Sequence, residues 1–122
     1  MGRRGGSDEI AAIVAAWREA GLAQDRAIAA DDAGAFNRLA RRLLAYETTL
    51  NDRAGDGRRA LLPLLADGNV QVRLNAAHAT LTIAPEAARQ ALAAIARDEA
   101  GTQAMDVGMT LRMLDDGRFV PR

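Results

Sequence analysis

The sequence contains no cysteine, one histidine and only four aromatic side chains. Without cysteine, disulfides, thiolate metal sites and cysteine nucleophiles are excluded, so packing alone must stabilise the fold. The single His78 leaves at most a carboxylate-rich metal site, and the sequence shows no clustered acidic motif that would build one. We therefore expect no metal, no cofactor and no catalytic residue.

Lysine is also absent, and the 16 arginines are balanced by 16 aspartates and glutamates to a formal charge of zero. A nucleic-acid binder usually carries a net basic field, so this balance argues against that class. No apolar run approaches the roughly 20 residues that a membrane-spanning helix requires. The basic start is similar to a signal peptide, but Asp8 and Glu9 directly before the apolar run argue against export. We expect a cytoplasmic protein with no membrane contact.

Alanine and leucine dominate what is present, with 28 and 14 copies in 122 residues. Alanine is the best helix former, whereas a sheet would need the β-branched and aromatic residues that are scarce here. The length and the 49% apolar content fit one domain with a real core. The composition predicts an all-α fold with a disordered arm over 1–7, one helical domain over 8–117 and a tail over 118–122.

Apolar residues recur at helical spacing along almost the whole chain, separated by glycines and acidic turns. This pattern predicts about six helices, with approximate bounds 8–30, 34–53, 58–67, 69–83, 85–99 and 103–114. Ser7 is the expected N-cap of the first helix, Pro85 the first residue of the fifth, and Gly117 the left-handed residue after the sixth. Pro63 must lie in the first turn of the third helix or kink it.

The segment LLPLLADGNVQVRLNAAHATL, residues 61–81, predicts two short antiparallel helices joined by an Asp-Gly-Asn turn. A single helix pair cannot bury both of its apolar faces, so stacked neighbours are implied. A shift of thirty residues repeats the apolar pattern. It superposes Leu62 on Leu92, Leu65 on Ile95, Leu74 on Ala104, Ala77 on Val107 and Leu81 on Leu111. The second half is therefore predicted to hold two stacked helix pairs.

The same segment resembles a HEAT repeat, through paired leucines around a proline, an Asp-containing turn, a Val-Arg pair and an alanine-rich second helix. The resemblance implies a HEAT-like, right-handed α-superhelix. It also implies that Asp67 and Arg73 belong to a structural ladder that links neighbouring repeats. Thirty residues further on, the equivalent positions hold Arg97 and Gln103, so a continuing ladder is not expected.

Short blocks along the chain carry a second resemblance. They are Gln24-Asp25, Asn37-Arg38-Leu39, Val72-Arg73-Leu74-Asn75-Ala76-Ala77 and Ala84-Pro85-Glu86. Through these blocks the chain resembles, from about residue 14 to 117, a small bacterial family known only as a domain of unknown function. The resemblance implies a HEAT-like all-α fold and supplies no activity.

The helix expected over 69–83 is apolar on two sides, with a narrow uncharged polar line between them. The line consists of Gln71, Asn75, His78 and Thr82, whose spacing places them along one edge of the helix. In a curved stack such a line can face the inner groove and offer hydrogen bonds to a partner. It is also what the water-facing strip of a mostly buried helix must look like, and we favour this second interpretation.

Glu47 falls inside the apolar stripe of the helix expected over 34–53. A carboxylate there must be paired, protonated or near enough to the edge to reach water. We favour an edge residue that reaches water or an arginine over an acid that contacts a ligand. Whether Glu47 and His78 share a pocket is left open by the sequence.

Met105, Met109 and Met113 follow one another at intervals of four on the outer side of the last helix. Three flexible apolar side chains in a row are typical of an adaptable contact surface, which here predicts a weak homodimer. The alternative is that Phe119 and Val120 in the tail fold back and cover them. The sequence does not choose between the two.

Three classes of function remain. We favour a non-catalytic protein-protein interaction module, an adaptor or inhibitor of another protein that binds by the surface of its helical stack. One alternative is a small-ligand binder or enzyme using Glu47 and His78, although no nucleophile motif or phosphate loop is present. The other is a nucleic-acid binder that uses Arg38, Arg41 and Arg42, which a solvated helix face explains equally well.

Overall fold

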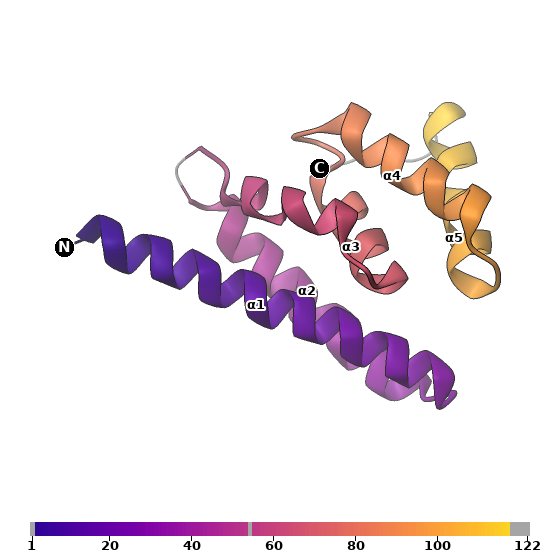
Figure 1. The fold of residues 1–122 in the computed structure, drawn as a ribbon, viewed down its shortest axis with the longest axis horizontal. Helices are drawn as coiled ribbons and strands as arrows, with labels where there is room; N and C mark the ends of the chain where they lie inside the picture. Colours follow the sequence, from indigo (N-terminus) through magenta and orange to yellow (C-terminus); the bar gives the residue numbers. More distant parts are fainter. Residues whose placement is uncertain (1, 54, 118–122) are drawn as a thin grey trace. The chain divides into compact units, whose positions relative to one another are not determined.

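The computed structural model describes residues 2–53 and 55–117, with side chains from residue 8 onward apart from Thr102. These residues form helices and no strand, so the predicted all-α fold is confirmed. In chain order the helices are α1 (Gly2–Ala29), α2 (Ala33–Asn51), η1 (Gly57–Ala66), α3 (Val70–Thr80), α4 (Pro85–Asp98) and α5 (Thr102–Asp115) (Figure 1). The superhelical arrangement implied by the HEAT resemblance stays a prediction.

The chain divides into two compact units, residues 1–61 and 62–122, which are described separately. The division falls inside η1 and inside the range 8–117 that the sequence predicts as one domain. Whether that range acts as one domain stays a prediction.

The first unit is a hairpin of two long helices, α1 and α2, that pack against each other (Figure 1). A tight turn joins them, with Asp31 at φ 54°. Asp32 then caps α2, because its side chain accepts a hydrogen bond of 3.0 Å from the backbone N–H of Ala35. The buried side chains of the hairpin include Trp17 on α1 and Leu43 and Leu50 on α2.

Helix α1 begins at Gly2, ahead of the start that we expected at Ser7. No proline interrupts this stretch, but positions 2, 5 and 6 are glycines, which are poor helix formers, so residue propensity does not explain the earlier start. Ser7 therefore lies inside the helix and is not its N-cap.

Helix η1 is a 3-10 helix, where the apolar spacing predicted an α-helix over 58–67. Pro63 lies inside it, and in an α-helix the proline ring would clash with the carbonyl group four residues earlier. Gly57, its first residue, passes close to the end of α2. A Cβ at that position would lie 2.7 Å from the carbonyl oxygen of Leu50, so only glycine fits.

In the second unit α3 packs against α4 and α5, and α4 packs against α5. Their core is aliphatic and consists of Leu74, Ala77, Leu81, Ala88, Leu92, Ile95 and Val107, with Leu65, Val70, Ala91, Leu111 and Leu114 partly buried around it. Several positions related by the thirty-residue shift lie in this one cluster. The thirty-residue repeat of the apolar pattern therefore reflects equivalent helix positions that pack into one core.

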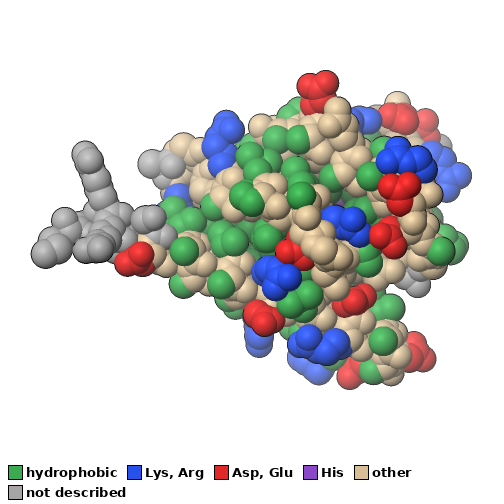
Figure 2. Space-filling view, in the orientation of Figure 1, with side chains coloured by type: hydrophobic (Ala, Val, Ile, Leu, Met, Phe, Trp, Pro, Cys, Tyr) green, Lys and Arg blue, Asp and Glu red, His purple; other side chains and the backbone are tan. Residues whose placement is uncertain are grey.

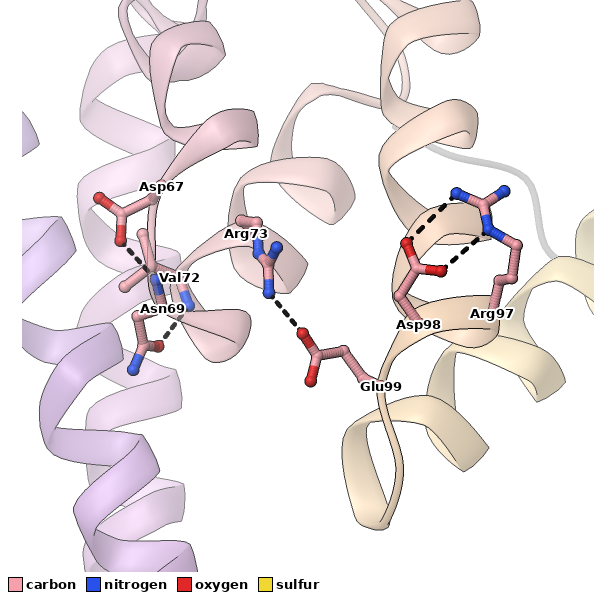
Figure 3. A network of polar contacts seen from close by, with 7 residues as sticks. All are labelled: Asp67, Asn69, Val72, Arg73, Arg97, Asp98 and Glu99. Carbon is pink, nitrogen blue, oxygen red and sulfur yellow. Dashed lines mark hydrogen bonds and ion pairs between the residues drawn. The ribbon is translucent and has the colours of Figure 1, made fainter.

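Local signals set the boundaries of these helices as predicted. In the Asp-Gly-Asn turn, Asp67 Oδ2 accepts a hydrogen bond of 3.0 Å from the backbone of Asn69, whose own Oδ1 caps α3 by accepting from Val72 N at 3.0 Å (Figure 3). Pro85 is the first residue of α4, and Gly117 follows α5 at φ 74°. A helix end leaves backbone groups without partners. Asn69 satisfies one of them, Pro85 has no N–H that would need a partner, and Gly117 takes the left-handed conformation that ends a helix.

Candidate functional site

Helix α5 presents two opposite sides. Val107 lies wholly inside the core of the second unit, with Leu111 and Leu114 beside it. On the other side Met105 is 76% exposed and Met109 is 57% exposed. We call this side, with Met105, Met109 and the half-buried Met113, the methionine face. Two of its three side chains lie in water, while Phe119 and Val120, the cover that the alternative interpretation requires, fall outside the described residues.

The methionine face contains an open hollow lined by Met105, Asp106, Gly108, Met109 and Arg112. Gly108 leaves the space, since a Cβ built there would meet nothing within 4 Å. Asp106 and Arg112 are exposed and flank Met109 along the helix. Within the part of the chain that the structure describes, neither forms an ion pair. The hollow thus combines apolar side chains with one exposed charge of each sign.

The polar line on α3 splits into a buried half and an exposed half. Gln71 is only 3% exposed, and its Nε2 donates to Asn75 Oδ1 at 3.0 Å. Gln103 on α5 donates from its own Nε2 to Gln71 Oε1 at 3.4 Å. His78 and Thr82 are exposed. A water-facing strip therefore describes the second half only, while the amides of the first half take part in linking α3 to α5.

His78 is exposed at the surface of the second unit. Desolvation by the atoms around the ring lowers its pKa, and the negative charge of Asp106 acts in the opposite direction. His78 belongs to the second unit and Glu47 to the first.

Glu47 on α2 lies in a polar cluster of the first unit. Its carboxyl is half-buried, and desolvation raises its pKa, while the Trp17 N–H and the positive charge of Arg58 partly oppose the shift. The indole Nε1 is buried and close enough to act on Glu47, but its geometry falls short of a full hydrogen bond. Arg58 donates to both carboxylate oxygens of Asp56, from Nε at 2.9 Å and from Nη2 at 2.6 Å.

Arg58 acts on Glu47 only through its charge, so the favoured interpretation of Glu47 as an edge residue that reaches water or an arginine stays a prediction. Because Arg58 commits its guanidinium to Asp56, Glu47 receives only indirect compensation for its burial. The cluster thus holds a carboxyl, with a pKa raised by burial, next to a buried indole. Its contacts fix the α1–α2 hairpin and the start of η1.

Asp67 and Arg73, the expected ladder pair, have different roles in the described contacts. Asp67 stabilises the turn before α3, whereas Arg73 forms an ion pair of 2.8 Å from Nη2 to Glu99 at the end of α4 (Figure 3). Arg97, at the position equivalent to Asp67, pairs with its neighbour Asp98. The acid that pairs with Arg73 is therefore Glu99, two residues beyond the position equivalent to Asp67. A repeating ladder stays a prediction.

The arginines proposed for nucleic-acid contact, Arg38, Arg41 and Arg42, are exposed on α2. Acidic and basic side chains are interspersed over the face shown in Figure 2, with no separate basic field on it. The described residues contain no cluster of three or more His, Cys, Asp or Glu that would hold a metal ion. Among the same residues, no helix has the length and apolar character that crossing a membrane demands.

Sequence reasoning missed four residues that complete these arrangements: Glu99, Gln103, Asp106 and Arg112. Gln103 and Glu99 lie at or near positions marked by the thirty-residue shift, so that signal was available. Asp106 and Arg112 stand three residues to either side of Met109, a symmetry that the apolar pattern alone does not reveal.

Comparisons with known proteins agree with this architecture. The chain is similar to the protein RPA1889 from Rhodopseudomonas palustris CGA009, whose crystal structure superposes with a TM-score of 0.89 at 41% sequence identity over 93% of each chain. No curated protein matches the chain. A family described as a domain of unknown function, DUF2019, matches residues 11–115. The chain therefore belongs to the DUF2019 family, as the predicted resemblance to a bacterial family of unknown function indicated.

Proposed function

We propose that this protein is a non-catalytic interaction module, an adaptor or inhibitor of another protein, that binds through the methionine face of α5. The observation that carries the proposal is the exposure of Met105 and Met109, 76% and 57%, side by side on one helix. Full burial of a methionine side chain contributes about 1.5–3 kcal/mol. Burial of both side chains against a protein partner would therefore contribute favourable free energy to binding.

The rest of α5 supports this role by fixing the helix in place. Val107 is fully buried, and Leu111 and Leu114 pack around the same core, so the outer face is presented from a rigid base. Unbranched methionines adapt to partner surfaces of different shape, and exposed apolar patches mark interaction sites. The zero formal charge and the mixed surface charges suit a protein partner better than a nucleic acid.

The proposal includes two further elements from the sequence. We place the protein in the cytoplasm, and we propose that the methionine face supports weak self-association. The alternatives gain less support. Glu47 is engaged in the cluster around Trp17 and Arg58, and the face drawn in Figure 2 carries no separate basic field.

The test is quantitative affinity capture from cells of the source organism. Three baits are compared: the wild-type chain, the Met109→Asp variant and the Leu44→Asp variant. Leu44 is 64% exposed on α2, so its variant is a matched control that adds the same charge to another exposed apolar position. We expect the yield of captured protein to fall at least about tenfold with Met109→Asp, because a charge would then be desolvated at the centre of an apolar contact. With Leu44→Asp the yield should stay at the wild-type level. Equal yields from all three baits would refute the methionine face as the binding surface.

A further inference from the structure

The methionine face carries sulfur atoms in side chains that solvent reaches. The chain has four methionines and no cysteine, so no thiolate is present to react with an oxidant ahead of a thioether. Met105 is 76% exposed and Met109 is 57% exposed, whereas Met113, four residues further along α5, is half-buried. A small dissolved oxidant therefore has freer access to the first two side chains than to the third.

The surroundings of Met105 and Met109 leave room for a larger and more polar group. Both side chains line the open hollow, and Gly108 between them has no side chain to fill it. Arg112 also lines the hollow and follows Met109 by three residues, which makes the two neighbours on the helix surface. Because a guanidinium carries only donors, Arg112 can donate a hydrogen bond to an oxygen added to Met109. Val107 is buried on the opposite side of the helix, away from any such change.

We propose that Met105 and Met109 form a reversible oxidation site, at which a hydroperoxide converts the two thioethers to sulfoxides and so prevents partner binding by the methionine face. The effect on binding rests on the proposed function, whereas the selective oxidation does not. A sulfoxide is polar and accepts hydrogen bonds, so its burial in an apolar contact is unfavourable where burial of the unmodified methionine is favourable. Oxidation would thus act on the same surface that the partner covers.

The reaction requires only the thioether and the oxidant. The sulfur lone pair attacks one oxygen of the hydroperoxide, an S–O bond forms and the O–O bond breaks. The proton on the transferred oxygen passes to the leaving oxygen, so the products are the sulfoxide and an alcohol, or water where the oxidant is hydrogen peroxide. Sulfur loses two electrons and the peroxide gains them. Methionine sulfoxide reductases reverse the change, one enzyme for each epimer of the sulfoxide.

Site-resolved mass spectrometry of the folded chain during treatment with hydrogen peroxide tests the site itself. We expect the rates to follow exposure, with Met105 and Met109 each oxidised at least about threefold faster than Met113. In the urea-unfolded chain the three rates should become similar, because the difference comes from the fold. Equal rates in the folded chain would overturn the site. Loss of helicity by circular dichroism after oxidation of these two side chains would also contradict a reversible change at the surface.

The effect on binding is tested by the affinity capture described above, with peroxide-treated baits and a lysate freed of thiol reductants. The matched variant is Met105→Leu/Met109→Leu, which keeps an apolar side chain at both positions but has no sulfur there. Peroxide should lower the yield from the wild-type bait at least about tenfold and leave the yield from the leucine variant unchanged. Treatment of the oxidised wild-type bait with both reductases should restore its yield. Met113→Leu, which retains both exposed thioethers, should respond to peroxide as wild type does.

The outcomes separate this inference from the proposed function. If Met109→Asp loses the captured protein but peroxide-treated wild type retains it, the effect of oxidation on binding is wrong and the proposed function stands. If the leucine variant responds to peroxide as strongly as wild type, the assignment to Met105 and Met109 is wrong. If neither Met109→Asp nor peroxide changes the yield, the proposed function and the effect of oxidation on binding are both wrong, and the order of the oxidation rates decides the site alone.

Discussion

The two units differ in whether their distinctive side chains are buried or exposed. The first, a hairpin of long helices, buries Trp17 completely and keeps Glu47 half-buried beside it. The second builds a wholly aliphatic core from short helices and leaves Met105 and Met109 in water. An unusual residue buried within a unit acts on stability, whereas one exposed on its surface is free to act on a partner. We therefore expect Glu47 in the first unit to act on stability, and the proposed recognition surface belongs to the second unit.

The largest effect is expected from Trp17→Ala in the first unit. Trp17 is fully buried, and removing such a side chain costs about 3–5 kcal/mol of unfolding free energy through lost burial and the cavity left behind. Urea unfolding followed by circular dichroism measures the change. A loss below about 1 kcal/mol would mean that the indole does not anchor the hairpin.

Leu92→Ala tests the aliphatic core of the second unit. Leu92 is fully buried among Leu74, Ile95 and Val107, so its truncation should cost about 2–5 kcal/mol. Leu44→Ala, at an exposed position, is the control and should stay within about 0.5 kcal/mol of wild type. Similar costs for the two variants in urea unfolding would contradict the assignment of the core.

Glu47→Gln tests the cost of burying a carboxyl near Trp17. Burial raises the folded-state pKa of Glu47 above its ordinary value of 4.5, so the folded state binds the proton more tightly than the unfolded chain. The stabilisation from this proton is complete below pH 4.5 and is lost as pH rises through the folded-state pKa. Glu47→Gln should therefore be more stable than wild type at pH 7, by less than either core substitution costs.

The measurement is thermal unfolding of both proteins between pH 4 and 7, in buffers of equal ionic strength. Wild type should lose stability relative to Glu47→Gln as pH rises through this range. Glu86→Gln removes an exposed carboxyl from α4 and serves as control. A Glu47→Gln variant that is less stable than wild type at pH 7 would show that the ionised carboxylate is favoured by the fold.

Met109→Asp is expected to separate binding from stability. Since Met109 is 57% exposed, its replacement should change the free energy of unfolding by no more than about 0.5 kcal/mol. Self-association in sedimentation should nevertheless disappear. A large loss of stability would place Met109 in the core and remove the basis of the proposal.

The smallest effect concerns the ion pair between Arg73 and Glu99. The side chain of Glu99 is 37% exposed and that of Arg73 is 28% exposed, so solvent screens their attraction. A double-mutant cycle with Arg73→Gln and Glu99→Gln should give a coupling of about 0.2–1 kcal/mol that falls with added salt. A coupling above 2 kcal/mol would make this pair the strong inter-repeat link that the HEAT resemblance implies.

Features set by neighbouring residues were predictable from the sequence. The six helices, the turn before α3, Pro85 at the start of α4 and Gly117 after α5 all depend on caps and backbone conformations within a few residues. The exposure of Met105 and Met109 was one of two open interpretations, since spacing shows that a face is apolar but not what covers it.

Features set by distant residues were not predictable. Trp17 and Glu47 meet only because the α1–α2 hairpin closes, and Gln71 is buried although its polar line suggested a water-facing strip. The pairing of Arg73 with Glu99 depends on where the end of α4 lies. The 3-10 form of η1 is different, because it follows from the local Pro63, whose ring would clash with an α-helical carbonyl group four residues earlier.

Site-specific photo-crosslinking in cells of the source organism tests the central claim most directly. A photoreactive amino acid is placed at position 109 in one variant and at position 44 in another. The account predicts covalent adducts with protein from position 109, either a second copy or a different chain, and none above background from position 44. Adducts from position 44 with none from position 109 would contradict it.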